Sequence, residues 1–152
     1  MLKAVVKNRR HGYKVITLLL DRRGDDVQIT EEVLKAAVGN GGHGYKVMEV
    51  LLDRRGDDVQ IIEEVLKAVV GSIYGHKVVA LLLDRRGDDV QITEEVLKAA
   101  VKSLYGDEVI ALLLNRQGDD IQITEEVLKA AIGSLHGDKV VALLLDRRGD
   151  DI

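Results

Sequence analysis

The chain has 152 residues, a formal net charge of −4 and no Cys, Pro, Phe or Trp. That length suits one domain with a core, which must here be built from Val, Leu, Ile and Ala. The missing Cys residues exclude disulfides, thiolate metal sites and thiol catalysis, and they fit a cytoplasmic protein. The mild acidity offers no basic patch to nucleic acid, and no apolar run approaches the roughly 20 residues of a membrane span.

One stretch of the chain is repeated along its length. The run Asp-Arg-Arg-Gly-Asp-Asp, or a close variant of it, begins at residues 21, 53, 84, 115 and 146, so the copies are 31 or 32 residues apart. A period of this size is typical of a solenoid or another repeat array. We divide the chain into five units, 1–24, 25–56, 57–87, 88–118 and 119–152. The first unit starts within a helix and lacks the connector that precedes the others.

The first helix of each unit, which we call helix A, is most clearly marked in the fourth unit. Thr93 is a good N-cap, and Glu94 and Glu95 lie where the helix dipole favours acidic groups. Gly106 is expected to end this helix, and Ile62 replaces the capping Thr in another copy, which should weaken that helix start by about 1 kcal/mol. The predicted apolar stripe consists of Val96, Leu97, Ala100, Val101 and Leu104.

The turn after helix A differs between units. The turns comprise residues 8–11, 39–43, 71–74, 102–105 and 133–136. From the glycines in the second turn we expect the second helix A to end near Val38, a turn earlier than its counterparts at Val70, Val101 and Ile132.

The second helix of each unit, helix B, should follow this turn and run back antiparallel to helix A. In the fourth unit Asp107 is the expected N-cap, and Gly118 is expected to end the helix in a left-handed conformation. The connector after it, residues 119–123, alternates apolar and polar side chains, so a short strand-like seam of stacked connectors is an open alternative. The sequence thus predicts an all-α fold, an α-solenoid of about five helix-turn-helix repeats with a period of 31–32 residues.

Residues 40–59 and 75–84 carry a resemblance to a known family. In both, a Gly-His pair precedes a helix that ends in Leu-Leu, and the first continues into Gly-Asp-Asp-Val, as in the second half of an ankyrin repeat. The chain resembles the ankyrin-like short helical repeats that form long arrays in large fungal NACHT-type receptor proteins. It departs from ankyrin in having Ile-Thr-Glu-Glu-Val in place of Thr-Pro-Leu-His, and its connector is too short for a β-hairpin finger. The resemblance implies protein recognition or array building.

Two short motifs have a functional and a structural interpretation. Residues 39–44 match G-x-G-x-x-G, but a dinucleotide loop follows a strand and here a helix precedes it, which favours a flexible turn. Arg-Gly-Asp at residues 23–25 recurs three times and is also an integrin-binding signature. Its place at the end of helix B favours a helix cap, with Arg complementing the dipole.

Acidic and histidine residues are the candidate metal ligands of the chain. Asp25, Asp26, Glu31 and Glu32 do not match a Ca²⁺ loop, and we expect these acids to pair with Arg of the next copy. One His per copy, at positions 11, 43, 76 and 136, gives no second ligand nearby. No nucleophile stands beside a base. The sequence therefore predicts a protein that is not an enzyme, with no metal site and no cofactor.

The function predicted from the sequence is that of a non-enzymatic helical-repeat scaffold that mediates protein–protein interaction. The turns and the starts of helix B vary most between copies, so they form the predicted interaction edge. Its residues are Arg9, Arg10, Tyr13, Asn40, His43, Tyr45, Tyr74, His76, Tyr105, Asp107, His136 and Asp138.

Two alternatives remain open at this point. The chain begins within helix A at Leu2 and stops in a connector at Ile152 without a polar capping unit, so it is a candidate for end-to-end stacking into filaments or rings. The predicted end-to-end contacts are Leu2, Val5, Val6, Leu144, Leu145 and Ile152. A designed or excised repeat fragment would have the same ends. The expected partners are other proteins or other copies of the chain, with neither nucleic acid nor membrane.

Overall fold

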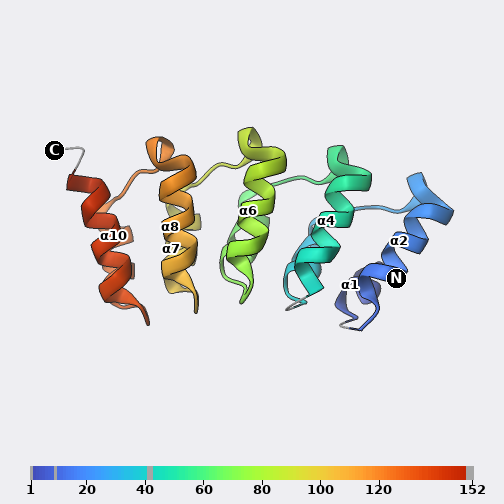
Figure 1. Ribbon diagram of the computed structural model, residues 1–152, viewed down its shortest axis with the longest axis horizontal. Coiled ribbons are helices and arrows are strands. Elements are labelled where there is room, and N and C mark those ends of the chain that lie inside the picture. Colours follow the sequence, from blue (N-terminus) through green and yellow to red (C-terminus); the bar gives the residue numbers. More distant parts are fainter. Residues whose placement is uncertain (1, 9, 41–42, 150–152) are drawn as a thin grey trace.

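The computed structural model of the chain describes residues 2–8, 10–40 and 43–149, with all their side chains except those of Asp25 and Arg148. These residues form α-helices that stand as antiparallel pairs in a single row (Figure 1). The A helices are α1 (Leu2–Lys7), α3 (Glu31–Val38), α5 (Glu63–Val70), α7 (Glu94–Lys102) and α9 (Glu125–Ile132). The B helices are α2 (Gly12–Arg23), α4 (Gly44–Arg55), α6 (Gly75–Arg86), α8 (Gly106–Gln117) and α10 (Gly137–Gly149). The predicted all-α solenoid is confirmed.

The core is a continuous apolar layer between the A row and the B row. Leu51, Leu82 and Leu113 occupy the same place in three consecutive B helices and are at most 1% exposed. Each is covered by its own helix A and by the adjacent units, because helix B contacts the helix B on either side of it. None of the described helices is both long and apolar enough to cross a membrane.

Thr N-caps start three of the A helices. In α7 the hydroxyl of Thr93 accepts a hydrogen bond of 3.3 Å from the amide of Val96, and Thr30 and Thr124 cap α3 and α9 in the same way. Ile62, which precedes α5, makes no such bond. The side-chain cap that the sequence predicted to be missing from this helix is therefore absent.

Gly106 does not end helix A as predicted: α7 ends at Lys102, and Gly106 is the first residue of α8. A Cβ atom at this position would lie 2.6 Å from the carbonyl oxygen of Ala100. Helix B starts so close to the end of helix A that only Gly fits between them. The glycines at positions 12, 44, 75 and 137 face a helix A carbonyl oxygen in the same way, at 2.4–2.8 Å.

Three other predictions for the turns are wrong. Tyr105 rather than Asp107 holds the N-cap position of α8, and Asp107 lies in the first turn of the helix. Leu104 lies in the turn, 49% exposed, and not in the apolar stripe of helix A. The second helix A does end at Val38, but α5 and α9 end at the equivalent positions. The extra residue of the second turn thus lengthens the turn and does not shorten the helix.

The helices α2, α4, α6 and α8 each run into a short 3-10 turn of sequence Gly-Asp-Asp. These turns are η1 (Gly24–Asp26), η3 (Gly56–Asp58), η4 (Gly87–Asp89) and η5 (Gly118–Asp120). The left-handed cap predicted at Gly118 is wrong, since its φ is −55° and only Gly24 among the described residues has a positive φ. The chain continues its right-handed turn there, so a left-handed residue is not needed. The connectors that follow contain no strand within the described residues, and the strand-like seam is not formed.

Candidate interaction edges

The row of A–B turns and the first turn of each helix B form one long edge of the array, which we call the turn edge. Ile73, Leu104 and Leu135 occupy the same position in three consecutive turns and are 53%, 49% and 71% exposed. Tyr74 and Tyr105 follow two of them and are also exposed. Single exposed apolar residues are ordinary, but a row of them is typical of a contact surface.

The three aliphatic residues were not predicted as interaction residues from the sequence. The helical period assigned Leu104 to the core, and Ile73 and Leu135 were only part of the turn. A signal was present: they follow Gly-Ser or Lys-Ser and precede the Gly that starts helix B, so they lie where helix A has already ended.

Aromatic and His side chains meet across neighbouring units on the turn edge. The rings of Tyr13 and His43 stack with centroids 6.3 Å apart, and the Lys46 ammonium lies 5.1 Å from the centre of the Tyr13 ring. Between the third and fourth units, the rings of His76 and Tyr105 meet edge to face with their centroids 6.5 Å apart. These contacts fix the rings without burying them fully, which suits side chains that present a rigid surface.

Charged groups adjoin these rings. The Nδ1 atom of His76 lies 3.5 Å from a carboxylate oxygen of Glu108. On α4 the carboxylate of Glu49 raises the pKa of Tyr45, chiefly through a hydrogen bond. The structure thus places the predicted residues Tyr13, His43, Tyr45, Tyr74, His76, Tyr105, Asp107, His136, Asp138 and Arg10 along the turn edge, exposed or half-buried. Arg9 lies outside the described residues.

Asn40 is not part of the exposed edge, and its prediction as an interaction residue is wrong. The residue is only 3% exposed, and its side-chain amide donates hydrogen bonds to the carbonyl oxygens of Val6 and Asn8. Asn40 therefore closes the C-terminal end of α1 from the next unit. The Ser residues at the equivalent positions 72, 103 and 134 bond instead to a carbonyl oxygen of their own helix A.

The predicted end-to-end contacts fall into three groups. Val6 and Leu144 are completely buried, so their prediction as contact residues is wrong: each belongs to the layer that joins the two helices of its unit. Leu2 and Val5 are half-buried and Leu145 is 51% exposed. Ile152 lies outside the described residues.

The opposite edge contains the ends of the B helices, the 3-10 turns and the connectors, and we call it the connector edge. Arg54 pairs with Asp21 at 2.6 Å, Arg85 with Asp53, and Arg116 with Asp84 at 2.7 Å, each across one unit boundary. The hydrogen bond to Asp53 is also the main cause that raises the pKa of Arg85. Exposed pairs of this kind contribute little individually.

The acidic partners in this ladder differ from those predicted. We expected the acids near the start of helix A, whereas the ladder uses the Asp in the last turn of helix B. At the fifth unit Arg147 turns instead to Asp119 of η5, at 2.8 Å, because Asn115 stands where the other units have Asp. There the acidic partner, Asp119, is the equivalent of Asp25, one of the acids that we expected to pair with Arg.

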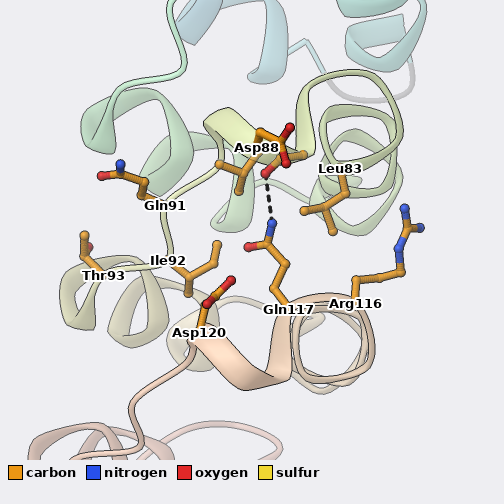
Figure 2. Close-up of a pocket in the computed structure, with 10 residues that line it drawn as sticks. Leu83, Asp88, Gln91, Ile92, Thr93, Arg116, Gln117 and Asp120 are labelled. Carbon is orange, nitrogen blue, oxygen red and sulfur yellow. Dashed lines mark hydrogen bonds between the residues drawn. The ribbon is translucent and has the colours of Figure 1, made fainter.

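A second, less exposed Arg ties two of the connectors to the following helix B. The guanidinium of Arg55, the last residue of α4, donates to the carbonyl oxygens of Gly24 and Val27, after the end of α2, at 2.6 and 2.9 Å and to Asp58, three residues further along the chain, at 2.6 Å. Arg86 repeats this arrangement one unit further on. In the next unit the position is occupied by Gln, beside a cavity of about 610 Å³ (Figure 2).

Among the described residues, no three His, Asp or Glu side chains lie close enough together to hold a metal ion.

Comparison with known proteins identifies one family. Its model, described as "Domain of unknown function (DUF7104)", matches residues 18–48, 50–78, 81–109, 112–140 and 143–152. The first four matches run from the middle of one helix B through the connector and helix A to the start of the next helix B. No curated protein and no solved structure matches the chain.

Proposed function

We propose that this chain, which belongs to the DUF7104 family, is a non-enzymatic scaffold that binds another protein through its turn edge. The observation that carries the proposal is the row of Ile73, Leu104 and Leu135, each about half exposed or more at the same place in consecutive units. Burying three such side chains against a partner would release water from a continuous apolar strip.

The side chains beside this strip support the proposal. The position of Tyr13 on α2 carries Tyr45, His76, Asp107 and Asp138 in the following units, so its chemistry changes from aromatic to acidic along the array. The B helices that carry these residues keep the same apolar layer in every unit. A rigid frame with variable surface positions gives each stretch of the edge its own specificity.

The kinship with ankyrin-like arrays is part of the same proposal. It rests on the Gly-His turn and the Leu-Leu helix end, together with the stacked helix pairs. In this chain the apolar turn residues would take the place of the absent hairpin finger as the contact surface.

A displayed peptide library tests the proposal. Binders are selected on the whole chain and then measured against the triple variant Ile73→Ser/Leu104→Ser/Leu135→Ser, which should keep its thermal midpoint because none of the three is buried. The matched control replaces three exposed acids of the A helices, Glu64, Glu95 and Glu126, by Ser. We expect most binders to bind the first variant with an affinity at least tenfold lower and to bind the control as tightly as the wild type. Equal affinities for the two variants would contradict the proposal.

A second candidate function, end-to-end self-association, is favoured by the exposed face of the last unit. Ile132 is 70% exposed, whereas its counterparts Val38, Val70 and Val101 are 0–4% exposed because the following unit covers them. Leu145 is 51% exposed, whereas Leu52 and Leu83 are each 7% exposed. An added unit would bury these two side chains.

The ionic ladder is complementary at its two ends. Arg22 corresponds to the Arg donors of the later units, and Asp146 corresponds to the Asp acceptors of the earlier ones. Neither is paired with any other described side chain. A second copy stacked head to tail would bring Arg22 of one chain to Asp146 of the other, and such a heterologous contact propagates into filaments or rings.

Sedimentation over a hundredfold concentration range tests this candidate. We expect species larger than 16.7 kDa to grow with concentration. The variants Arg22→Glu and Asp146→Arg should each weaken growth, and the double variant should restore it. A single species of one chain's mass at every concentration would refute self-association.

A further inference from the structure

On the connector edge the repeat is interrupted at a cavity between the third and fourth units. Figure 2 shows Gln117 entering it from the end of α8, with Leu83 and Ile92 on either side and Asp120 beneath. The side-chain amide of Gln117 donates one hydrogen bond, of 3.1 Å, to the carbonyl oxygen of Gly87. The cavity measures about 610 Å³.

The two preceding unit junctions show what the same place holds elsewhere in the chain. There the guanidinium of Arg55 or Arg86 donates to two carbonyl oxygens of the chain segment after the preceding helix B and to the carboxylate of the Asp three residues after the Arg itself. The planar, five-donor group fits these three acceptors at once. These two junctions define a guanidinium-binding arrangement within this fold.

At the third junction the acceptors are kept while the guanidinium is replaced. Gln is shorter than Arg and reaches only the first acceptor, Gly87. The two others are the carbonyl oxygen of Val90 and the carboxylate of Asp120, and no described residue donates a hydrogen bond to either. Both line the cavity.

The charge around the cavity is suited to a cation. Its charged lining residues are Asp88, Asp120 and Arg116, and in Figure 2 the side chain of Arg116 points away from Gln117. Its guanidinium is held by Asp84 at 2.7 Å, so it does not neutralise Asp120.

We propose that this cavity binds the guanidinium group of an arginine side chain presented by another protein. The bound group would donate to Val90 and Asp120 as Arg86 donates to Val59 and Asp89. The site lies at the far end of helix B from the turn edge, and the inference does not depend on the function proposed for that edge. A lysine side chain, with a compact charge and no planar fork, would fit the two acceptors less well.

The direct test is a titration of the ¹⁵N-labelled chain with N-acetyl-arginine methylamide, followed by amide chemical shifts. We expect saturable shifts confined to residues 87–92 and the Gln117 side-chain amide. The corresponding citrulline derivative, which has the same shape without the charge, should cause none. The equivalent residues 56–61 serve as an internal control, because Arg86 already occupies their site. Scattered shifts, no saturable shift, or equal shifts with citrulline would overturn the proposal.

Three variants then locate the site. Gln117→Arg supplies the guanidinium from within the chain and should weaken binding at least tenfold without lowering the thermal midpoint. Asp120→Asn should weaken binding severalfold, whereas Asp89→Asn, the matched change at an occupied junction, should leave it unchanged. Wild-type affinity in Gln117→Arg would overturn the proposal. These changes do not alter the turn edge, so either binding proposal can be refuted without refuting the other.

Discussion

The two long edges of the array are built in opposite ways. On the connector edge the same polar contacts recur: Arg54 with Asp21, Arg85 with Asp53, and Arg116 with Asp84. On the turn edge the backbone geometry recurs while the side chains change from Tyr to His to Asp. The comparison shows that one edge ties neighbouring units together, which leaves the side chains of the other available to vary.

The glycines Gly106 on the turn edge and Gly87 on the connector edge also differ in what surrounds them. A Cβ atom on Gly106 would collide with the backbone of helix A, whereas one on Gly87 would meet no atom within 4 Å. Gly87 also has ordinary right-handed angles, φ −53° and ψ −39°. Glycine is thus required at the turn edge for close approach, whereas at Gly87 on the connector edge no steric reason requires it.

The largest effect should come from the core that both edges share. Leu113→Ala removes a fully buried side chain and should lower the free energy of unfolding by about 2 to 5 kcal/mol. Urea denaturation followed by circular dichroism measures this loss. The exposed Leu104→Ala is the control and should change it by less than about 0.5 kcal/mol. An unchanged midpoint for Leu113→Ala would mean that the buried face of helix B is wrongly assigned.

At the turn edge, Gly106→Ala should destabilise the chain by about 1 to 3 kcal/mol, since the new methyl group meets a backbone oxygen that cannot move aside easily. A thermal melt measures the change, at roughly 2 to 4 °C per kcal/mol for a chain of this size. If the variant melted at or above the wild-type temperature, the close approach of the helices would be disproved.

At the connector edge, Ile62→Thr should stabilise the chain by about 1 kcal/mol, because it supplies the N-cap that α5 lacks. The new hydroxyl would also face Glu31 as Thr93 faces Glu63, to which it donates a hydrogen bond. Ile62→Val, which has the branched shape without the hydroxyl, should give no such gain in a thermal melt. Equal melting of the two variants would contradict the capping argument.

The smallest effect should be Gly87→Ala, a stabilisation of about 0.4 to 1 kcal/mol that arises mainly from a less flexible unfolded chain. Its comparison with Gly106→Ala is the sharpest test of the two edges, since the same substitution is expected to have opposite signs. A loss of stability in both variants would show that glycine is needed on both edges.

Most of the architecture could be predicted from the sequence because each unit carries its own local signals for where helices start and end. The Thr caps, the missing cap at Ile62 and the period of the Gly-Asp-Asp run depend on neighbours a few residues apart. The same local reasoning assigned Gly106 as the end of helix A and a left-handed conformation to Gly118, and both assignments are wrong. The first is required by contact with another helix, and the second continues a right-handed turn.

The candidate site could be predicted only in outline. The variable turns lie together along one edge of the array, but the sequence did not show that Leu104 is exposed or that Asn40 is buried. Helical periodicity extended past the true end of α7, and Asn40 bonds to carbonyl oxygens of residues 6 and 8, in the preceding unit.

By itself, the sequence determined the helices, their pairing into five units and the repeated ionic side chains, because these follow from short-range patterns and from identity between copies. Only the tertiary structure decided which Asp each Arg meets and which turn residues face solvent. It also decided that Gln117 borders a cavity where the other units hold an Arg. Those features depend on side chains about 30 residues apart meeting across a unit boundary, at distances that a local sequence pattern does not encode.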